Sequence, residues 1–116
     1  MSAGDSDRLS HMLTAARKVL AITSGQTRED LDNDEVLSLA VVRLLEILGE
    51  AAKNVSDSLR DQHGSIPWKQ IAGTRDRLIH GYFEVDLDIV WSIIRDDLRP
   101  LIERVEQILA GGGGSP

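Results

Sequence analysis

Residues 34–54 read DEVLSLAVVRLLEILGEAAKN, and this stretch decides the fold class. Its apolar side chains recur every three or four residues, which is the period of an α-helix. After Asp34 and Glu35, its charged side chains share one narrow stripe that could lie at a dimer interface: Arg43, Glu46, Glu50 and Lys53. A helix that is apolar on most sides has more than one neighbour. We therefore expect this helix at the centre of a bundle, or also facing another subunit.

The chain before this stretch predicts one more long helix and a loop. Asp5 and Ser6 are good N-caps for the first helix, whose apolar residues follow at helical spacing. An acidic loop is expected over residues 26–33. Asp32 precedes Glu35 by three residues, which favours a capping box at the start of the second helix.

The chain after this stretch predicts two further long helices and a short one. A short helix is expected over residues 56–62 and a long helix over residues 67–80, because Pro67 suits a first turn. The last helix begins near Asp86, and Pro100 should kink it by removing one backbone donor. No segment shows strand periodicity. The prediction is an all-α bundle of four long helices plus a short one.

The composition is that of one globular domain. The 116 residues suffice for a single domain, which we place at residues 1–110, with a flexible glycine-rich tail at residues 111–116. No apolar run approaches the roughly 20 residues that cross a bilayer, and the polar N-terminus does not resemble a signal peptide. The absence of cysteine excludes disulfides, thiolate nucleophiles and cysteine metal sites. We expect a cytoplasmic protein with no membrane association.

The net charge of −6 argues against a protein that coats nucleic acid. The acidic residues are not spread evenly, since residues 29–35 hold five carboxylates and no base. Between residues 67 and 82, three basic residues accompany a single acid, Asp76. The sequence therefore permits, without requiring, a small anion-binding site on an acidic body.

The same basic segment holds the residues best suited to chemistry. His80 is a natural general acid or base, because an imidazole titrates near neutral pH. Asp76 precedes it by four residues, so on a helix the two side chains would share a face. Arg75 suits a phosphate group or a phosphorane transition state through paired hydrogen bonds.

One straight helix does not bring Arg75 and His80 together. Five residues place two side chains about 140° apart around a helix axis. Either the helix ends and turns, or a second copy of the chain completes the site. Cleavage by an internal 2′-hydroxyl group usually needs both a base and an acid, and a twofold dimer would supply two histidines.

Plainer interpretations of these residues exist. A histidine at a helix C-terminus, such as His80, commonly interacts with the helix dipole. Arg75 and Arg77 could form a solvated ion-pair face with their neighbours. His11 and His63 lack partners at metal-ligand spacing, and we predict no metal or cofactor site.

The series Arg75, four residues, His80, one residue, Tyr82 resembles the signature of HepT, a family within the HEPN superfamily of helical ribonucleases. The likeness spans residues 5–109 and is carried by further segments. These are Ile66-Pro67-Trp68, Gly73, Leu44-Leu45-Glu46-Ile47-Leu48-Gly49-Glu50-Ala51-Ala52 and Val85-Asp86-Leu87-Asp88-Ile89-Val90-Trp91.

This resemblance implies a HEPN-type bundle and the toxin of a type II toxin–antitoxin pair. The toxin would be a homodimeric, metal-independent endoribonuclease that cleaves RNA by 2′-hydroxyl transesterification. Arg75 and His80 match the catalytic pair, and Asp76 matches a supporting polar residue. The implied partner is an antitoxin of the minimal nucleotidyltransferase (MNT) type, which would neutralise the toxin by AMPylation of Tyr82. A bulky anion there would occupy the place of the RNA phosphate.

Two alternatives belong to other classes of protein. One is a non-catalytic helical module that docks the nucleotidyltransferase after RNA cleavage has been lost. The other is a purely structural helical dimer, which would neither cleave RNA nor undergo tyrosine modification.

Overall fold

The computed structural model describes residues 1–81 and 84–111. Its two longest helices are α1 (Ala3–Thr23) and α3 (Glu35–Lys53). The other elements are α2 (Arg28–Asn33), α4 (Asp57–Gln62), α5 (Trp68–Ala72), α6 (Thr74–Leu78), β1 (Ile79–His80), β2 (Glu84–Val85), α7 (Leu87–Ser92), the π-helical turn η1 (Ile93–Asp97) and α8 (Leu98–Leu109). The all-α prediction is confirmed, with a two-strand ladder as the small addition. The predicted tail lies outside the described residues beyond Gly111.

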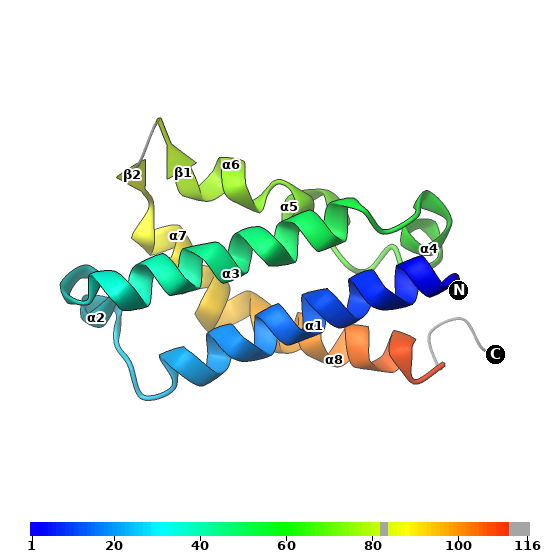
Figure 1. The fold of residues 1–116 in the computed structure, drawn as a ribbon, viewed down its shortest axis with the longest axis horizontal. Helices are drawn as coiled ribbons and strands as arrows, with labels where there is room; N and C mark the ends of the chain where they lie inside the picture. The colour runs from blue at the N-terminus through cyan, green and yellow to red at the C-terminus, as the bar shows by residue number, and fades with distance from the viewer. Residues whose placement is uncertain (82–83, 112–116) are drawn as a thin grey trace.

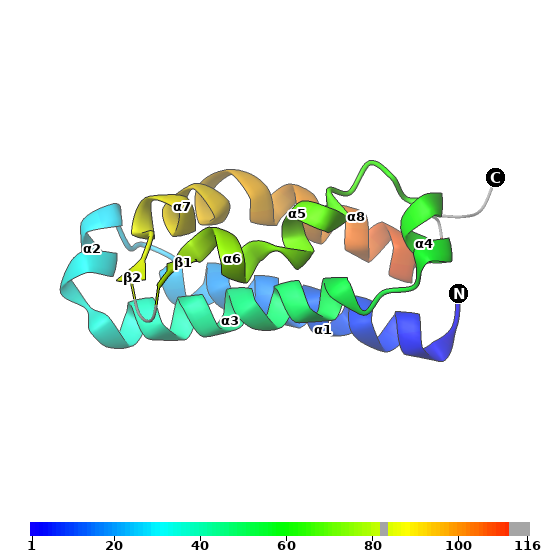
Figure 2. The ribbon, with the colours of Figure 1, turned by 90° about the horizontal axis from the view of Figure 1, so that it is seen from above.

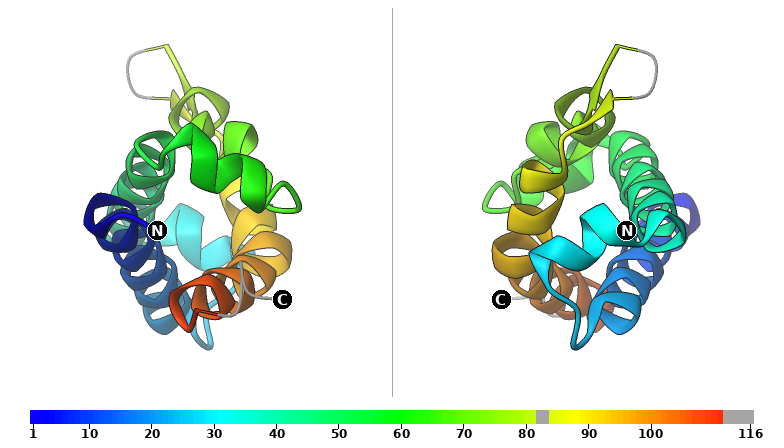
Figure 3. Two further views of the ribbon diagram at one scale, coloured as in Figure 1. Left: turned by 90° about the vertical axis from the view of Figure 1, so that its right-hand side faces the viewer. Right: turned by 90° about the vertical axis from the view of Figure 1, so that its left-hand side faces the viewer.

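The bundle has four sides. Helices α1 and α3 lie side by side (Figure 1), and α8 packs against α1, so that the chain from α7 to α8 runs opposite α3. Helices α5 and α6 occupy the remaining side, between α3 and the α7–α8 segment when seen from above (Figure 2). Strands β1 and β2 stand out from the bundle next to α6 (Figure 3).

An almost purely aliphatic core holds these helices together. Its fully buried side chains come from α1, α2, α3, α6, α7 and α8, with Val55 between α3 and α4: Leu9, Met12, Val19, Leu31, Val41, Leu45, Val55, Leu78, Val90, Leu98 and Val105. Trp68 is also buried, and its indole N–H donates to the carbonyl of His63 at 2.9 Å. Within the described residues, no helix is long and apolar enough to cross a membrane.

The helix starts in the first half differ from the predicted ones. Ser2 caps α1, because its hydroxyl accepts from the N–H of Asp5 at 3.0 Å, and Asp5 lies inside the helix. The expected acidic loop contains α2, which begins with a capping box between Thr27 and Asp30. Asp34 rather than Asp32 caps α3. The caps of α1 and α3 lie two or three residues from the predicted ones, so both helices were predicted with the wrong start, whereas α2 was not predicted.

The predicted helix over residues 67–80 is broken in two places. Gly73 separates α5 from α6, and the hydroxyl of Thr74 donates to the carbonyl of Ile71, which a continuous helix would use for its own backbone. Helix α6 then ends at Leu78, whose carbonyl accepts from the N–H of Asp86 at 2.8 Å. The bundle therefore has three long helical segments, and two short helices form its fourth side.

The last helical segment is irregular just before Pro100. Asp86 caps α7 as predicted. Residues 93–97 form the π-helical turn, in which the N–H of Leu98 donates to the carbonyl of Ile93. Proline has no N–H to offer the carbonyl four residues earlier, so a regular helix cannot continue unperturbed through this region. The irregularity that the structure shows is this π-helical turn, which lies just before the predicted kink at Pro100.

Candidate functional site

A short hairpin presents His80 at the surface. In the ladder between β1 and β2, Ile79 pairs with Val85 and His80 pairs with Glu84. Gly81 follows with a φ of 73°, a left-handed conformation that glycine adopts without strain. The His80 side chain is 58% exposed, so its imidazole is open to a ligand from solvent.

Arg75 lies on α6, one helical turn before the hairpin, and extends over α3. Its side chain is 73% exposed, and its Nε lies 3.9 Å from an Oε of Glu46. The Glu46 side chain is only 24% exposed, and its carboxylate lies beside one edge of the guanidinium at the surface of α3. Within the described residues the other N–H groups of Arg75 have no partner, and they can donate to an anion.

Asp86 provides the carboxylate nearest to the imidazole of His80. One oxygen, Oδ2, lies 3.8 Å from Nε2 of His80. The other oxygen, Oδ1, accepts from the backbone N–H groups of Asp88 and Ile89, each at 3.1 Å. The Asp86 side chain thus joins the hairpin to the start of α7.

The expected pairing of Asp76 with His80 is not formed. It required both residues to lie on one helix, and α6 ends at Leu78 before the chain becomes extended. Asp76 is exposed on α6 and makes no hydrogen bond or ion pair with His80 in the described structure. Tyr82, the predicted site of AMPylation, lies outside the described residues.

Arg75 and His80 are therefore exposed on consecutive elements, and each has its own carboxylate. No hydrogen bond or ion pair joins the two in the part of the chain described here. Sequence reasoning missed Glu46 and Asp86 as partners. Glu46 belonged to the charged stripe of the central helix and Asp86 marked a helix start, but neither signal indicated which cation each would meet.

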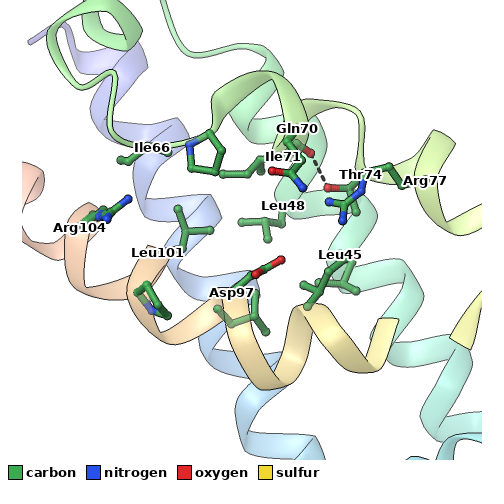
Figure 4. Close-up of a pocket in the computed structure, with 14 residues that line it drawn as sticks. Leu45, Leu48, Ile66, Gln70, Ile71, Thr74, Arg77, Asp97, Leu101 and Arg104 are labelled. Atoms are coloured by element: carbon green, nitrogen blue, oxygen red, sulfur yellow. Dashed lines mark hydrogen bonds between the residues drawn. The ribbon is translucent and has the colours of Figure 1, made fainter. Parts of the chain in front are cut away.

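A separate cavity of about 210 Å³ lies between α5–α6 and the η1–α8 segment (Figure 4). Its apolar wall includes Leu48 and Leu101, and Asp97 points into it from η1. Arg77 lines this cavity, whereas Arg75, two residues earlier, contacts α3. Residues two apart lie about 200° apart around a helix. The cavity and Arg75 therefore lie on different faces of α6.

Residues 1–81 and 84–111 contain no group of three or more histidine, aspartate or glutamate side chains that could hold a metal ion. The fold is a helical bundle with two exposed basic side chains, Arg75 and His80, on the consecutive elements α6 and β1. The sequence matches the HepT-like ribonuclease family over residues 12–108. The chain belongs to this family.

Curated relatives agree with the family match. A protein of Caldanaerobacter subterraneus subsp. tengcongensis, named provisionally as an RNase, is 43% identical over 101 residues, covering 87% of this chain and 90% of the relative. A protein of Thermococcus cleftensis, whose name assigns it provisionally as the ribonuclease HepT, is 34% identical over 108 residues, covering 93% of this chain and 98% of the relative. No solved structure matches the chain significantly.

Proposed function

We propose that this protein is a metal-independent endoribonuclease and the toxin of a type II toxin–antitoxin system. The observation that carries the proposal is the exposed Arg75 and His80, held on α6 and β1 in a chain of the HepT-like ribonuclease family. Both groups are open to solvent, as a site for a polymeric substrate requires. The names of the relatives also favour RNA as the substrate.

The chemistry assigned to the site is transesterification. His80 of one protomer removes the proton from a 2′-hydroxyl group, and the 2′-oxygen attacks the adjacent phosphorus. The bond to the 5′-oxygen breaks, and that oxygen receives a proton from an acid such as the second His80 of a dimer. Arg75 donates to the oxygens that gain charge in the phosphorane. The products are a 2′,3′-cyclic phosphate and a 5′-hydroxyl end.

A homodimer through α3 is part of the proposal. Val36 and Leu39 are 78% and 61% exposed, and Ile47 is 36% exposed. They share a helix face, here called the α3 face, whose residues are Val36, Leu39, Arg43, Ile47 and Glu50. Exposed apolar groups in such a row favour association. Glu46, which contacts Arg75, borders this face, so pairing of two α3 faces would bring both arginines towards the interface.

An antitoxin of the MNT type is the proposed partner, and AMPylation of Tyr82 is the proposed means of control. Tyr82 follows His80 by two residues in the sequence. An AMP group attached there would add a bulky anion close to the base, and it would compete with the phosphate of RNA for Arg75.

A growth experiment tests the toxin assignment. Expression of the parent should arrest growth, and Arg75→Ala and His80→Ala should each abolish the arrest at equal protein level. Matched controls are Arg99→Ala and His11→Ala, which replace the same residue types at exposed positions away from the site. Growth arrest by both site variants would contradict the assignment.

Mass spectrometry tests the partnership. The toxin co-expressed with its nucleotidyltransferase should gain the mass of AMP, and Tyr82→Phe should not. Modification together with a parent that never cleaves RNA would favour the alternative function, a module that only docks the nucleotidyltransferase. An unmodified toxin that is still neutralised would contradict AMPylation as the means of control.

A further inference from the structure

We infer that Asp86 is a positioning residue that orients the imidazole of His80. The inference rests on the proposed function for its catalytic consequence, but its structural basis is independent of that function. Asp86 lies six residues after His80 and belongs to the next helix. Of the described carboxylates, it is the one that makes an ion pair with His80.

The cap of α7 fixes the Asp86 carboxylate. Its Oδ1 accepts from two backbone N–H groups, and its own N–H donates to the carbonyl of Leu78 at 2.8 Å. Both its backbone and its side chain are therefore held by the fold. The remaining oxygen, Oδ2, is held 3.8 Å from Nε2 of His80 and has no other partner within the described residues. The side chain is 34% exposed, so solvent screens it only in part.

The neighbouring carboxylates do not compete for this role. Glu84 is the ladder partner of His80, but it is exposed and makes no ion pair with it in the described chain. Asp76 lies on α6, and in the described residues it makes no hydrogen bond or ion pair with the imidazole. The Asp86 carboxylate is already fixed because it caps α7. It therefore loses less conformational entropy when it contacts the imidazole than the exposed carboxylates of Glu84 and Asp76 would lose.

The contact assigns different roles to the two imidazole nitrogens. A carboxylate beside Nε2 favours the tautomer that carries its proton on Nε2, which leaves the lone pair of Nδ1 available. Nδ1 is then the atom that accepts the proton from the 2′-hydroxyl group. The distance of 3.8 Å exceeds that of a hydrogen bond, and such contacts commonly tighten when substrate binds.

Asp86→Asn tests the inference, with Asp88→Asn as the matched control. Asparagine caps a helix about as well as aspartate, so the free energy of unfolding should stay close to that of the parent. The Asp88 side chain is 87% exposed and contacts Arg28 instead of His80. We expect Asp86→Asn to lower kcat for RNA cleavage by about tenfold or more with KM little changed, and Asp88→Asn to leave both near parental values. An unchanged kcat in folded Asp86→Asn would overturn the inference.

Nitrogen NMR separates this inference from the proposed function. The ¹⁵N shifts of neutral His80, assigned by their loss in His80→Ala, should show the Nε2–H tautomer more fully in the parent than in Asp86→Asn. Exposed His11 in the same spectrum serves as the reference. Identical His80 shifts in parent and variant would overturn the inference even if the parent cleaves RNA. A parent that cleaves no RNA would overturn the proposed function. The ¹⁵N shifts would still show whether Asp86 orients the imidazole of His80.

Discussion

Asp5 joins the first turn of α1 to the start of α4. It is buried at 6% exposure, and it accepts from the backbone N–H and the hydroxyl of Ser56 at 2.9 and 2.6 Å. The hydroxyl of Ser56, the backbone N–H and the Ser2 side chain lower the pKa of Asp5, and burial opposes them. Because Ser56 also caps α4, one carboxylate fixes the start of the segment that leads to α5 and α6.

This contact predicts a pH-dependent loss of stability. Asp5→Asn should lower the free energy of unfolding at pH 7 by about 1–3 kcal/mol, because the hydroxyl and backbone N–H of Ser56 lose their charged acceptor. Since folding lowers the pKa of Asp5, its contribution is complete above the unfolded pKa of about 4 and is lost as pH falls through the folded value. Denaturant unfolding at several pH values should show the difference from the parent shrinking in acid. Asp7→Asn, which alters an exposed carboxylate of α1, should cause little loss, and a constant difference across pH would contradict the account.

At the scale of the elements, Gly49 sets how closely α5 approaches α3. A Cβ atom at Gly49 would lie 2.9 Å from the carbonyl oxygen of Ile71. Gly49→Ala should therefore displace the α5–α6 segment and lower the free energy of unfolding by about 1–3 kcal/mol. The better helix propensity of alanine, about 1 kcal/mol, offsets part of this loss.

The measurement for Gly49→Ala is thermal unfolding together with RNA cleavage. We expect a lower Tm and slower cleavage, because Arg75 lies on α6. Gly64→Ala is the control, since a Cβ at Gly64 would meet nothing within 4 Å. A Tm above that of the parent for Gly49→Ala would show that α5 does not need this close approach.

Helix periodicity was enough to predict α1, α3 and the α7–α8 segment, because their apolar positions repeat over many turns. It failed over residues 67–80, where two contacts outside the predicted helix decide the backbone. The carbonyl of Ile71 packs at Gly49, and the carbonyl of Leu78 accepts from Asp86. The family signature predicted Arg75 and His80 as site residues, whereas the carboxylates beside them depend on tertiary contacts that the signature does not contain.

At the scale of the whole molecule, the exposed apolar residues of the α3 face predict a dimer. One charge introduced into this face by substitution should dissociate it. Leu39→Glu should convert a dimer of twice the monomer mass into a monomer and should abolish RNA cleavage, because a charge is costly to bury in an interface. Light scattering at micromolar concentration measures the mass. Ile22→Glu makes the same change at an exposed position of α1 and should leave the dimer intact. A parent that is monomeric at these concentrations would contradict a site to which two protomers contribute.

The central claim is that His80 and Arg75 cleave RNA without a metal ion. The most direct measurement is cleavage of a mixed RNA pool in EDTA by the parent, His80→Ala and Arg75→Ala, with analysis of the product ends. We predict that the parent alone cuts the pool and leaves cyclic phosphate ends. Equal cutting by all three proteins, or cutting by the parent that EDTA abolishes, would contradict the account.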